Sequence, residues 1–205
     1  MITIVDYGMG NLRSVQKAIE LFCRGVRVSS SADDIRASDK VVLPGVGAFG
    51  KAMEELEKRK LVRPLIEFIE NGKPFLGICL GFQLLFSQSE EAKKVKVLGI
   101  LKGKVRMFKD AQGLKIPHMG WNRISVRRKA QSAKILEGVP DGAYMYFVHS
   151  YYAEPKDKDI VLCETGYGEN FASGIYKGNI YAFQFHPEKS QGMGLRIIKN
   201  FAELC

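Results

Sequence analysis

The chain has 205 residues, of which 46% are hydrophobic, so we expect residues 1–205 to form one domain with a substantial core. Its formal net charge is +9, but the basic residues form short separate clusters without a nucleic-acid motif, which argues against nucleic-acid binding and leaves an acidic protein partner or a solvated surface. No apolar run approaches the roughly 20 residues of a membrane-spanning helix, and the first residues enter a strand pattern without a basic leader, so we expect a cytoplasmic protein without membrane contact.

The first ninety residues alternate between predicted strands and helices. Strands are predicted over residues 2–6, 26–29, 40–43 and 74–78, the last of which is a short apolar run that ends at a small-residue turn. Asn11 can cap a helix whose apolar residues recur at helical spacing until Gly25. Further helices are predicted over residues 52–71, with an interruption around Arg63-Pro64, and over residues 80–86. This alternation is typical of βαβ units and predicts a parallel sheet.

The pattern changes from Gly99 onward to short strands and turns. We expect strands over residues 100–108, 144–148, 160–165, 173–176 and 180–185, followed by a helix over residues 193–204. The sequence contains no internal repeat, low-complexity tract or linker.

A cysteine between two glycines joins the predicted strand 74–78 to the helix that follows, in the segment Gly77-Ile78-Cys79-Leu80-Gly81. A strand, a tight turn and a helix place one side chain above the sheet, and the glycines leave room for it. Backbone N–H groups at the helix start favour a thiolate, so Cys79 is predicted to be a reactive nucleophile. The alternative is a small buried hydrophobic residue, which is the reading that we adopt for Cys23, Cys163 and Cys205.

The four cysteines lack C-x-x-C spacing. They therefore indicate neither a disulfide framework nor a zinc site. We expect a reducing compartment, no metal and no cofactor.

One of the three histidines has a carboxylate two residues away, in His186-Pro187-Glu188. If an extended backbone continued through Pro187, both side chains would point to the same side. Glu188 would then hold one ring nitrogen of His186 while the other faced the thiol. The alternative is a plain strand end with an exposed acid. His118 and His149 lack such a neighbour and are interpreted as structural or interface histidines.

Five segments of the chain together resemble the class I, or triad-type, glutamine amidotransferase family, and within it the glutaminase subunits of imidazole glycerol phosphate synthases. These segments, which follow one another in the family's order, are Asp6-Tyr7-Gly8-Met9-Gly10-Asn11, Pro44-Gly45-Val46-Gly47-Ala48-Phe49, residues 77–86 around Cys79, Pro117-His118-Met119-Gly120-Trp121-Asn122, and His186-Pro187-Glu188-Lys189-Ser190. The resemblance implies a flavodoxin-like α/β fold with a mostly parallel central sheet, flanking helices and additional antiparallel strands in the C-terminal half.

The resemblance also implies a reaction, the hydrolysis of L-glutamine. Cys79 would attack the side-chain amide carbon, His186 would pass a proton to the leaving ammonia, and Glu188 would hold the imidazole. A glutamyl thioester would form and be hydrolysed to glutamate.

The resemblance assigns an oxyanion site to Leu80 and to the loop that contains Val46 and Gly47. Val46 stands where other amidotransferases have a glycine, which suggests a resting orientation with a carbonyl facing the site. We therefore expect rotation of the Val46-Gly47 peptide to switch the enzyme on. The alternative is a purely structural turn.

Glutamine contacts are expected from Gln83, Glu91 and the backbone at His149 and Ser150. Ordinary alternatives are an amphipathic helix position for Gln83 and a solvated acid for Glu91.

Released ammonia needs an acceptor, so the resemblance implies a heterodimer with a (β/α)8-barrel cyclase subunit that makes imidazole glycerol phosphate and aminoimidazole carboxamide ribotide in histidine biosynthesis. The residues carried over for docking are Asn11, Met119, Trp121, Asn122 and Lys189. A buried indole and a solvated lysine are the alternatives for Trp121 and Lys189.

Other functions stay open at this point. A paralogous subunit that feeds a sugar-amination enzyme or another synthase would use the same triad. A cysteine peptidase of similar architecture and a nonenzymatic binding module are further alternatives, and the latter would tolerate loss of Cys79.

Overall fold

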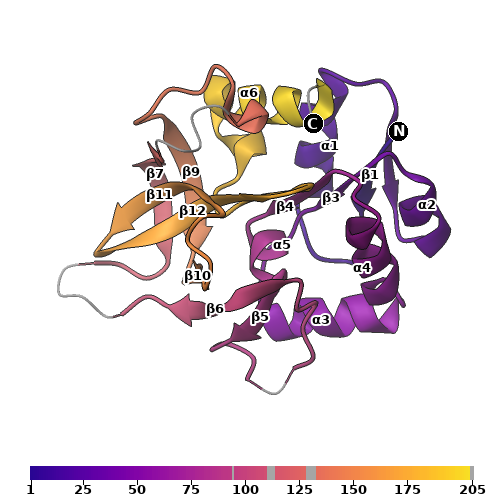
Figure 1. The fold of residues 1–205 in the computed structure, drawn as a ribbon, viewed down its shortest axis with the longest axis horizontal. Helices are drawn as coiled ribbons and strands as arrows, with labels where there is room; N and C mark the ends of the chain where they lie inside the picture. The colour runs from indigo at the N-terminus through magenta and orange to yellow at the C-terminus, as the bar shows by residue number, and fades with distance from the viewer. Residues whose placement is uncertain (94, 110–113, 128–132, 204–205) are drawn as a thin grey trace.

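The computed structural model describes residues 1–93, 95–109, 114–127 and 133–203. Their strands build an eight-stranded central sheet, in which the first five strands run parallel and the next three pair antiparallel (Figure 1). In spatial order these strands are β2 (Val26–Ser29), β1 (Ile2–Val5), β3 (Lys40–Leu43), β4 (Phe75–Ile78), β13 (Ile180–Phe183), β12 (Glu169–Lys177), β11 (Val161–Tyr167) and β8 (Ser125–Val126). This arrangement confirms the expected α/β fold.

Helices cover both faces of the parallel part of the sheet (Figure 1). On one face, α1 (Leu12–Glu20) and α6 (Gln191–Glu203) pack their apolar sides against Ile4, Val42 and Ile78. On the other lie α2 (Ala32–Ala37), α3 (Phe49–Lys58) and α4 (Val62–Glu70). Because successive residues of a strand point to opposite faces, the buried strands are apolar on both sides.

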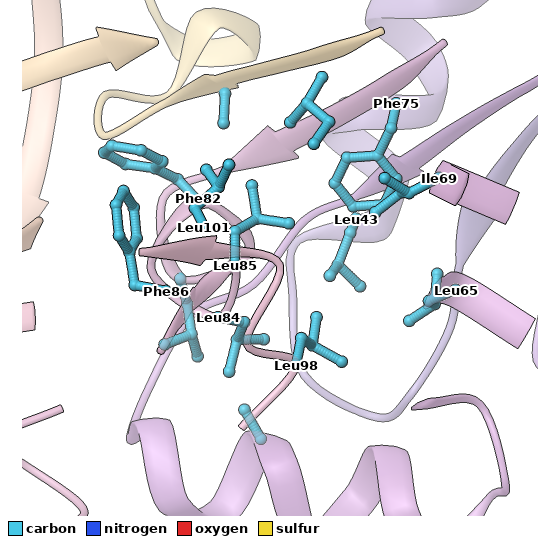
Figure 2. Packing of buried hydrophobic residues seen from close by; sticks show 14 of the residues in the cluster. Leu43, Leu65, Ile69, Phe75, Phe82, Leu84, Leu85, Phe86, Leu98 and Leu101 are labelled. Carbon is cyan, nitrogen blue, oxygen red and sulfur yellow. The ribbon is translucent and has the colours of Figure 1, made fainter. Parts of the chain in front are cut away.

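The core on the α3 and α4 face extends beneath the turn after β4. Figure 2 shows Leu43 and Phe75 of the sheet beside Ile69 of α4, and Phe82 and Phe86 further along the same cluster. The rings of Phe82 and Phe86 meet edge to face, with centroids 5.4 Å apart. The turn that carries Cys79 therefore rests on a packed apolar base, which restricts its movement.

Two smaller sheets complete the C-terminal half. Strand β6 (Leu101–Met107) lies between β10 (Tyr151–Pro155) and β5 (Phe86–Ser89). Strands β7 (His118–Arg123) and β9 (Tyr144–His149) form an antiparallel pair that places His118 opposite His149. Single helical turns are α5 (Leu80–Gln83), η2 (Lys134–Leu136) and η3 (Pro187–Lys189).

The helix predicted over residues 52–71 is two helices, and the break lies before Pro64 rather than at it. α3 ends at Lys58, Lys60 has a positive φ of 57°, and α4 begins at Val62. Pro64 falls in the first turn of α4, where a missing N–H costs no helical hydrogen bond.

Several other boundaries differ from the predictions. The helix after Cys79 ends at Gln83, because Phe86 enters strand β5, and α1 ends at Glu20, well before Gly25. Strand β13 ends at Phe183, whereas β12 is longer than expected. α6 begins at Gln191, and residue 204 of the predicted helix lies outside the described residues. The sequence patterns did not predict α2, β5, β7 or β10. Within the described ranges, no helix is long and apolar enough to cross a membrane.

Candidate active site

Cys79 occupies a sharp turn between β4 and α5. Its φ is 54°, an uncommon conformation for a residue other than glycine, and its backbone N–H donates to Phe183 O at 2.8 Å. A Cβ atom on Gly81 would lie 1.8 Å from Leu43 O, and one on Gly77 would lie 2.9 Å from Gly81 O. The two glycines therefore let the turn pack directly on β3 and on itself, which is a more specific reason than leaving room for the thiol.

The extended geometry that we expected for His186-Pro187-Glu188 is wrong, but its consequence holds. The chain leaves β13 at Phe183 and turns through η3, so a 3-10 turn brings the two side chains together. His186 Nδ1 and Glu188 Oε1 are 2.8 Å apart, and these side chains are only 3% and 1% exposed. Within the described part of the chain, His186 Nε2 and Glu188 Oε2 are buried without a hydrogen-bond partner.

Ser190, which the sequence reasoning missed as a site residue, fixes the histidine backbone. Its hydroxyl donates to His186 O at 2.7 Å and accepts from Tyr146 N at 2.9 Å. His186 N in turn donates to Tyr146 O at 2.9 Å. No local sequence pattern indicated this role, because the hydroxyl binds the backbone of His186 and Tyr146 rather than the start of α6.

The electrostatics of the site favour a protonated imidazole. Burial by itself lowers the pKa of His186, but the neighbouring Cys79 and Glu188 outweigh that effect and together raise it to about 10. Glu188 accepts from Nδ1, so the proton on Nε2 is the one available to the sulfur side. The arrangement can therefore deliver a proton to a group that leaves from a Cys79 adduct.

A cavity of about 360 Å³ opens in front of the cysteine. Its lining brings together Cys79 and every residue predicted for the oxyanion and glutamine contacts, namely Val46, Gly47, Leu80, Gln83, Glu91, His149 and Ser150. His186 and Glu188 are not part of this lining. A small ligand in the cavity can therefore contact Cys79 without contacting His186 or Glu188.

The predicted oxyanion donor at Leu80 is occupied. Leu80 N donates to Gly45 O at 3.3 Å. The carbonyl that faces this donor therefore belongs to the Gly45–Val46 peptide, one peptide earlier than we expected. Tyr7 lies beneath the loop, fully buried, and its hydroxyl donates to Pro44 O at 2.9 Å. Burial, with a contribution from Cys79, raises the pKa of Tyr7, so the hydroxyl stays a donor.

Gln83 and Glu91 both line the cavity but already bind the protein. Gln83 Nε2 donates to Tyr151 O at 2.8 Å and to Gln184 Oε1 at 3.0 Å, which leaves its own oxygen for a ligand. Glu91 Oε2 accepts from Phe49 N, at the start of α3, at 3.2 Å. Glu91 is therefore an anchored acid rather than a freely solvated one.

The residues predicted for docking do not form a single group. Trp121 packs edge to face on Tyr146 with centroids 6.0 Å apart, and Lys189 Nζ lies 5.8 Å from the same ring. Met119, on the same strand as Trp121, is exposed. Asn122 points inward instead, and Asn11 accepts from Ser14 N as the cap of α1. Tyr146 is the member of this cluster that the sequence reasoning missed.

His118 and His149 form a buried pair next to the cavity, whose lining includes His149. His118 Nδ1 and His149 Nε2 are 3.0 Å apart, His149 Nδ1 donates to Tyr151 O at 2.7 Å, and Asn122 Nδ2 lies 3.2 Å from His118 Nε2. Burial lowers the pKa of His118 to about 4 and that of His149 to about 3. Both rings are therefore neutral near pH 7.

The remaining cysteines lie apart from the cavity lining. Cys163 is fully buried, which raises its pKa to about 12, and Cys23 is half-buried. Cys205 lies outside the described residues. Within the described ranges, no group of three or more His, Cys, Asp or Glu residues could hold a metal ion.

Comparison with family models identifies the class of protein. The model of a family described as glutamine amidotransferase class-I matches residues 3–204. The chain therefore belongs to the class I glutamine amidotransferase family.

Two proteins that are similar to this chain over nearly their whole length carry the same name. "Imidazole glycerol phosphate synthase subunit HisH" of Methanocaldococcus jannaschii is 48% identical over 204 residues, covering 100% of both chains. The protein of the same name from Aquifex aeolicus is 51% identical over 199 residues, covering 97% of this chain and 94% of that one.

Solved structures support the fold independently. A structure described as a glutamine amidotransferase superposes with a TM-score of 0.75 at 17% identity, covering 98% of this chain and 99% of the other. The structure of PurLQS from Thermotoga maritima gives a TM-score of 0.71 at 21% identity, with 98% and 96% coverage.

Proposed function

We propose that this protein is the glutaminase subunit of an imidazole glycerol phosphate synthase. The observation that carries the proposal is the cavity lined by Cys79, together with the buried His186–Glu188 pair. The names of the full-length relatives point to the same subunit. The substrate is L-glutamine, and the products are glutamate and ammonia.

The reaction proceeds through a thioester. The sulfur of Cys79 attacks the side-chain amide carbon of glutamine, and the carbonyl oxygen becomes an oxyanion. The proton on His186 Nε2 passes to the amide nitrogen, the C–N bond breaks, and ammonia leaves. His186 then takes a proton from water, whose oxygen attacks the thioester carbon, and the C–S bond breaks to release glutamate. Glu188 holds the ring throughout, because its oxygen accepts from Nδ1.

The oxyanion site is closed in the resting chain. Leu80 N–H is the natural donor at the elbow, but it donates to Gly45 O. Rotation of the Gly45–Val46 peptide withdraws that carbonyl and turns the Val46 N–H toward the cavity, which supplies a second donor. We propose that a loaded partner drives this rotation, so that glutamine is split only when ammonia has a destination.

The partner is a (β/α)8-barrel cyclase that converts a phosphoribosyl-formimino carboxamide ribonucleotide and ammonia into imidazole glycerol phosphate and aminoimidazole carboxamide ribotide. Met119 and the Trp121–Tyr146–Lys189 cluster supply the docking contacts. Exposed aromatic and methionine side chains with a cation at the rim suit such an interface.

A glutamate-release assay tests the proposal. We expect slow release by the isolated chain, a large increase with the cyclase and its nucleotide, and none with a Cys79→Ala variant under either condition. The same assay with casein in place of glutamine distinguishes a glutaminase from a cysteine peptidase. Full activity of the isolated chain would refute the switch, and stimulation by a sugar-amination synthase but not by the cyclase would favour the paralogous subunit.

A further inference from the structure

We propose that Gln184 is a fixed hydrogen-bond donor to the sulfur of Cys79, and that Gln83 sets its orientation. The inference rests on the proposed function, because it concerns the same nucleophile. Gln184 Nε2 lies 3.8 Å from Cys79 Sγ, and Gln184 is fully buried. It was not among the residues that the sequence singled out, although it is the polar residue in the apolar run 180–185.

The direction of the Gln184 amide follows from its neighbours. Tyr151 O can only accept, so the Gln83 atom 2.8 Å from it must be the nitrogen. The other N–H of that nitrogen donates to Gln184, 3.0 Å away, so the Gln184 atom facing Gln83 must be the oxygen. The Gln184 nitrogen is thereby turned toward the sulfur. If the Gln184 amide were flipped, its nitrogen would face the nitrogen of Gln83, and two donors would oppose each other.

A donor beside the sulfur matters because a backbone carbonyl, which can only accept, also lies near it. Cys79 Sγ lies 3.9 Å from Val148 O, a contact that suits the S–H form and opposes the thiolate. His186 can donate to the sulfur, but it gives up its proton to the leaving ammonia during the reaction. An amide N–H does not titrate, so Gln184 stabilises negative charge on sulfur both before attack and when the thioester breaks.

The position of Gln184 separates this role from substrate binding. Gln83 lines the cavity, whereas Gln184 is not part of its lining. Loss of the Gln184 donor should therefore slow the chemistry and leave glutamine affinity in place. This predicts a fall in kcat with little change in KM.

The test is the pH profile of Cys79 alkylation by iodoacetamide in the isolated full chain, followed site by site by peptide mass spectrometry. We compare the unmodified protein with Gln184→Met, which removes the donor, and Gln184→Glu, which keeps the shape. Gln88→Met makes the same change at an exposed glutamine of β5 and is the matched control. Thermal unfolding establishes that each variant is folded.

Both Gln184 variants should move the midpoint of the profile upward by about 0.5–1 pH unit and slow alkylation at pH 7 by about 3- to 10-fold. Gln88→Met should leave the midpoint unchanged. Unshifted profiles in the folded Gln184 variants would overturn the inference and leave the proposed function standing. If Cys79 of the unmodified protein reacts no faster than the half-buried Cys23, both are overturned.

Discussion

Two glycines in one helix make a matched pair of substitutions that tests how η3 is held. Both Gly192 and Gly194 belong to the first turn of α6. A Cβ on Gly194 would lie 2.0 Å from Pro187 O and 2.6 Å from Ser190 Cβ, whereas a Cβ on Gly192 meets no atom within 4 Å. Neither glycine has a positive φ. The two alanine variants therefore differ in packing rather than in backbone strain.

The magnitudes follow from these distances. Alanine in a helix is favoured over glycine by up to about 1 kcal/mol, so Gly192→Ala should be neutral or slightly stabilising. In Gly194→Ala the Pro187 carbonyl must move by about 1 Å to relieve the contact, and overpacking of this kind costs typically about 1–3 kcal/mol. Because both variants gain the same helix preference, they should differ by about 1–3 kcal/mol in unfolding free energy, or roughly 2–12 °C in Tm for a chain of this size.

The same displacement should reach the proposed catalytic pair. Pro187 lies between His186 and Glu188, and a misplacement of about 1 Å can cost a catalytic site about 100-fold. We expect kcat/KM of partner-stimulated glutamine hydrolysis to fall about 10- to 100-fold in Gly194→Ala and to stay within twofold in Gly192→Ala. Urea unfolding and the glutamate assay measure both effects. Equal stability of the two variants, or full activity of Gly194→Ala, would refute the argument that η3 is held by contact with α6.

Three further predictions concern other parts of the chain. Tyr7→Phe leaves the buried Pro44 carbonyl without its donor and should lower the unfolding free energy by about 1–3 kcal/mol in urea titrations; an unchanged midpoint would contradict the role of this hydroxyl. Lowering the pH from 7 to 5 protonates His118 and His149 in the unfolded chain, where the pKa is near 6.5, but not in the folded chain, where burial lowers these values to about 4 and 3. The free energy of unfolding that is present above the unfolded pKa is therefore lost as the pH falls, by about 2 kcal/mol per histidine. His118→Phe removes one of the two histidines, so urea titrations of this variant should show a smaller loss over the same pH range. An equal loss would contradict the lowered pKa of His118. Trp121 is 46% exposed, so Trp121→Ala should change stability by less than about 0.5 kcal/mol and weaken cyclase binding at least about tenfold, measured by titrating stimulated activity; a large loss of stability would instead favour a core role.

Sequence patterns predicted those parts of the fold and site in which one local rule decides the outcome. The strands over residues 26–29 and 40–43 have the predicted bounds, the first half-buried with alternating valines and the second buried except at Lys40. The turn at Cys79 follows from a strand that ends at closely spaced glycines. The cavity lining that the resemblance implied lies together around Cys79.

The remaining features depend on contacts between distant segments. The four-residue α5 ends early because Phe86 pairs with Leu101 in a separate sheet. The residues near Phe86 in the sequence do not indicate that pairing. Gln184 and Ser190 act through hydrogen bonds to Gln83 and Tyr146 across the fold. The occupied donor at Leu80 depends on how the loop at Gly45 is oriented, and residue types alone do not fix a peptide orientation.

The position of β13 has a consequence for the order in which the chain becomes reactive. This strand, which precedes His186, is inserted between β4 and β12, so the centre of the sheet stays incomplete until the last quarter of the chain is present. During synthesis the segment with Cys79 is made well before β13 and His186, which it contacts in the finished sheet. The proposed nucleophile thus lacks its proposed base until nearly the whole protein exists, and fragments that end before residue 180 should carry a cysteine without that base.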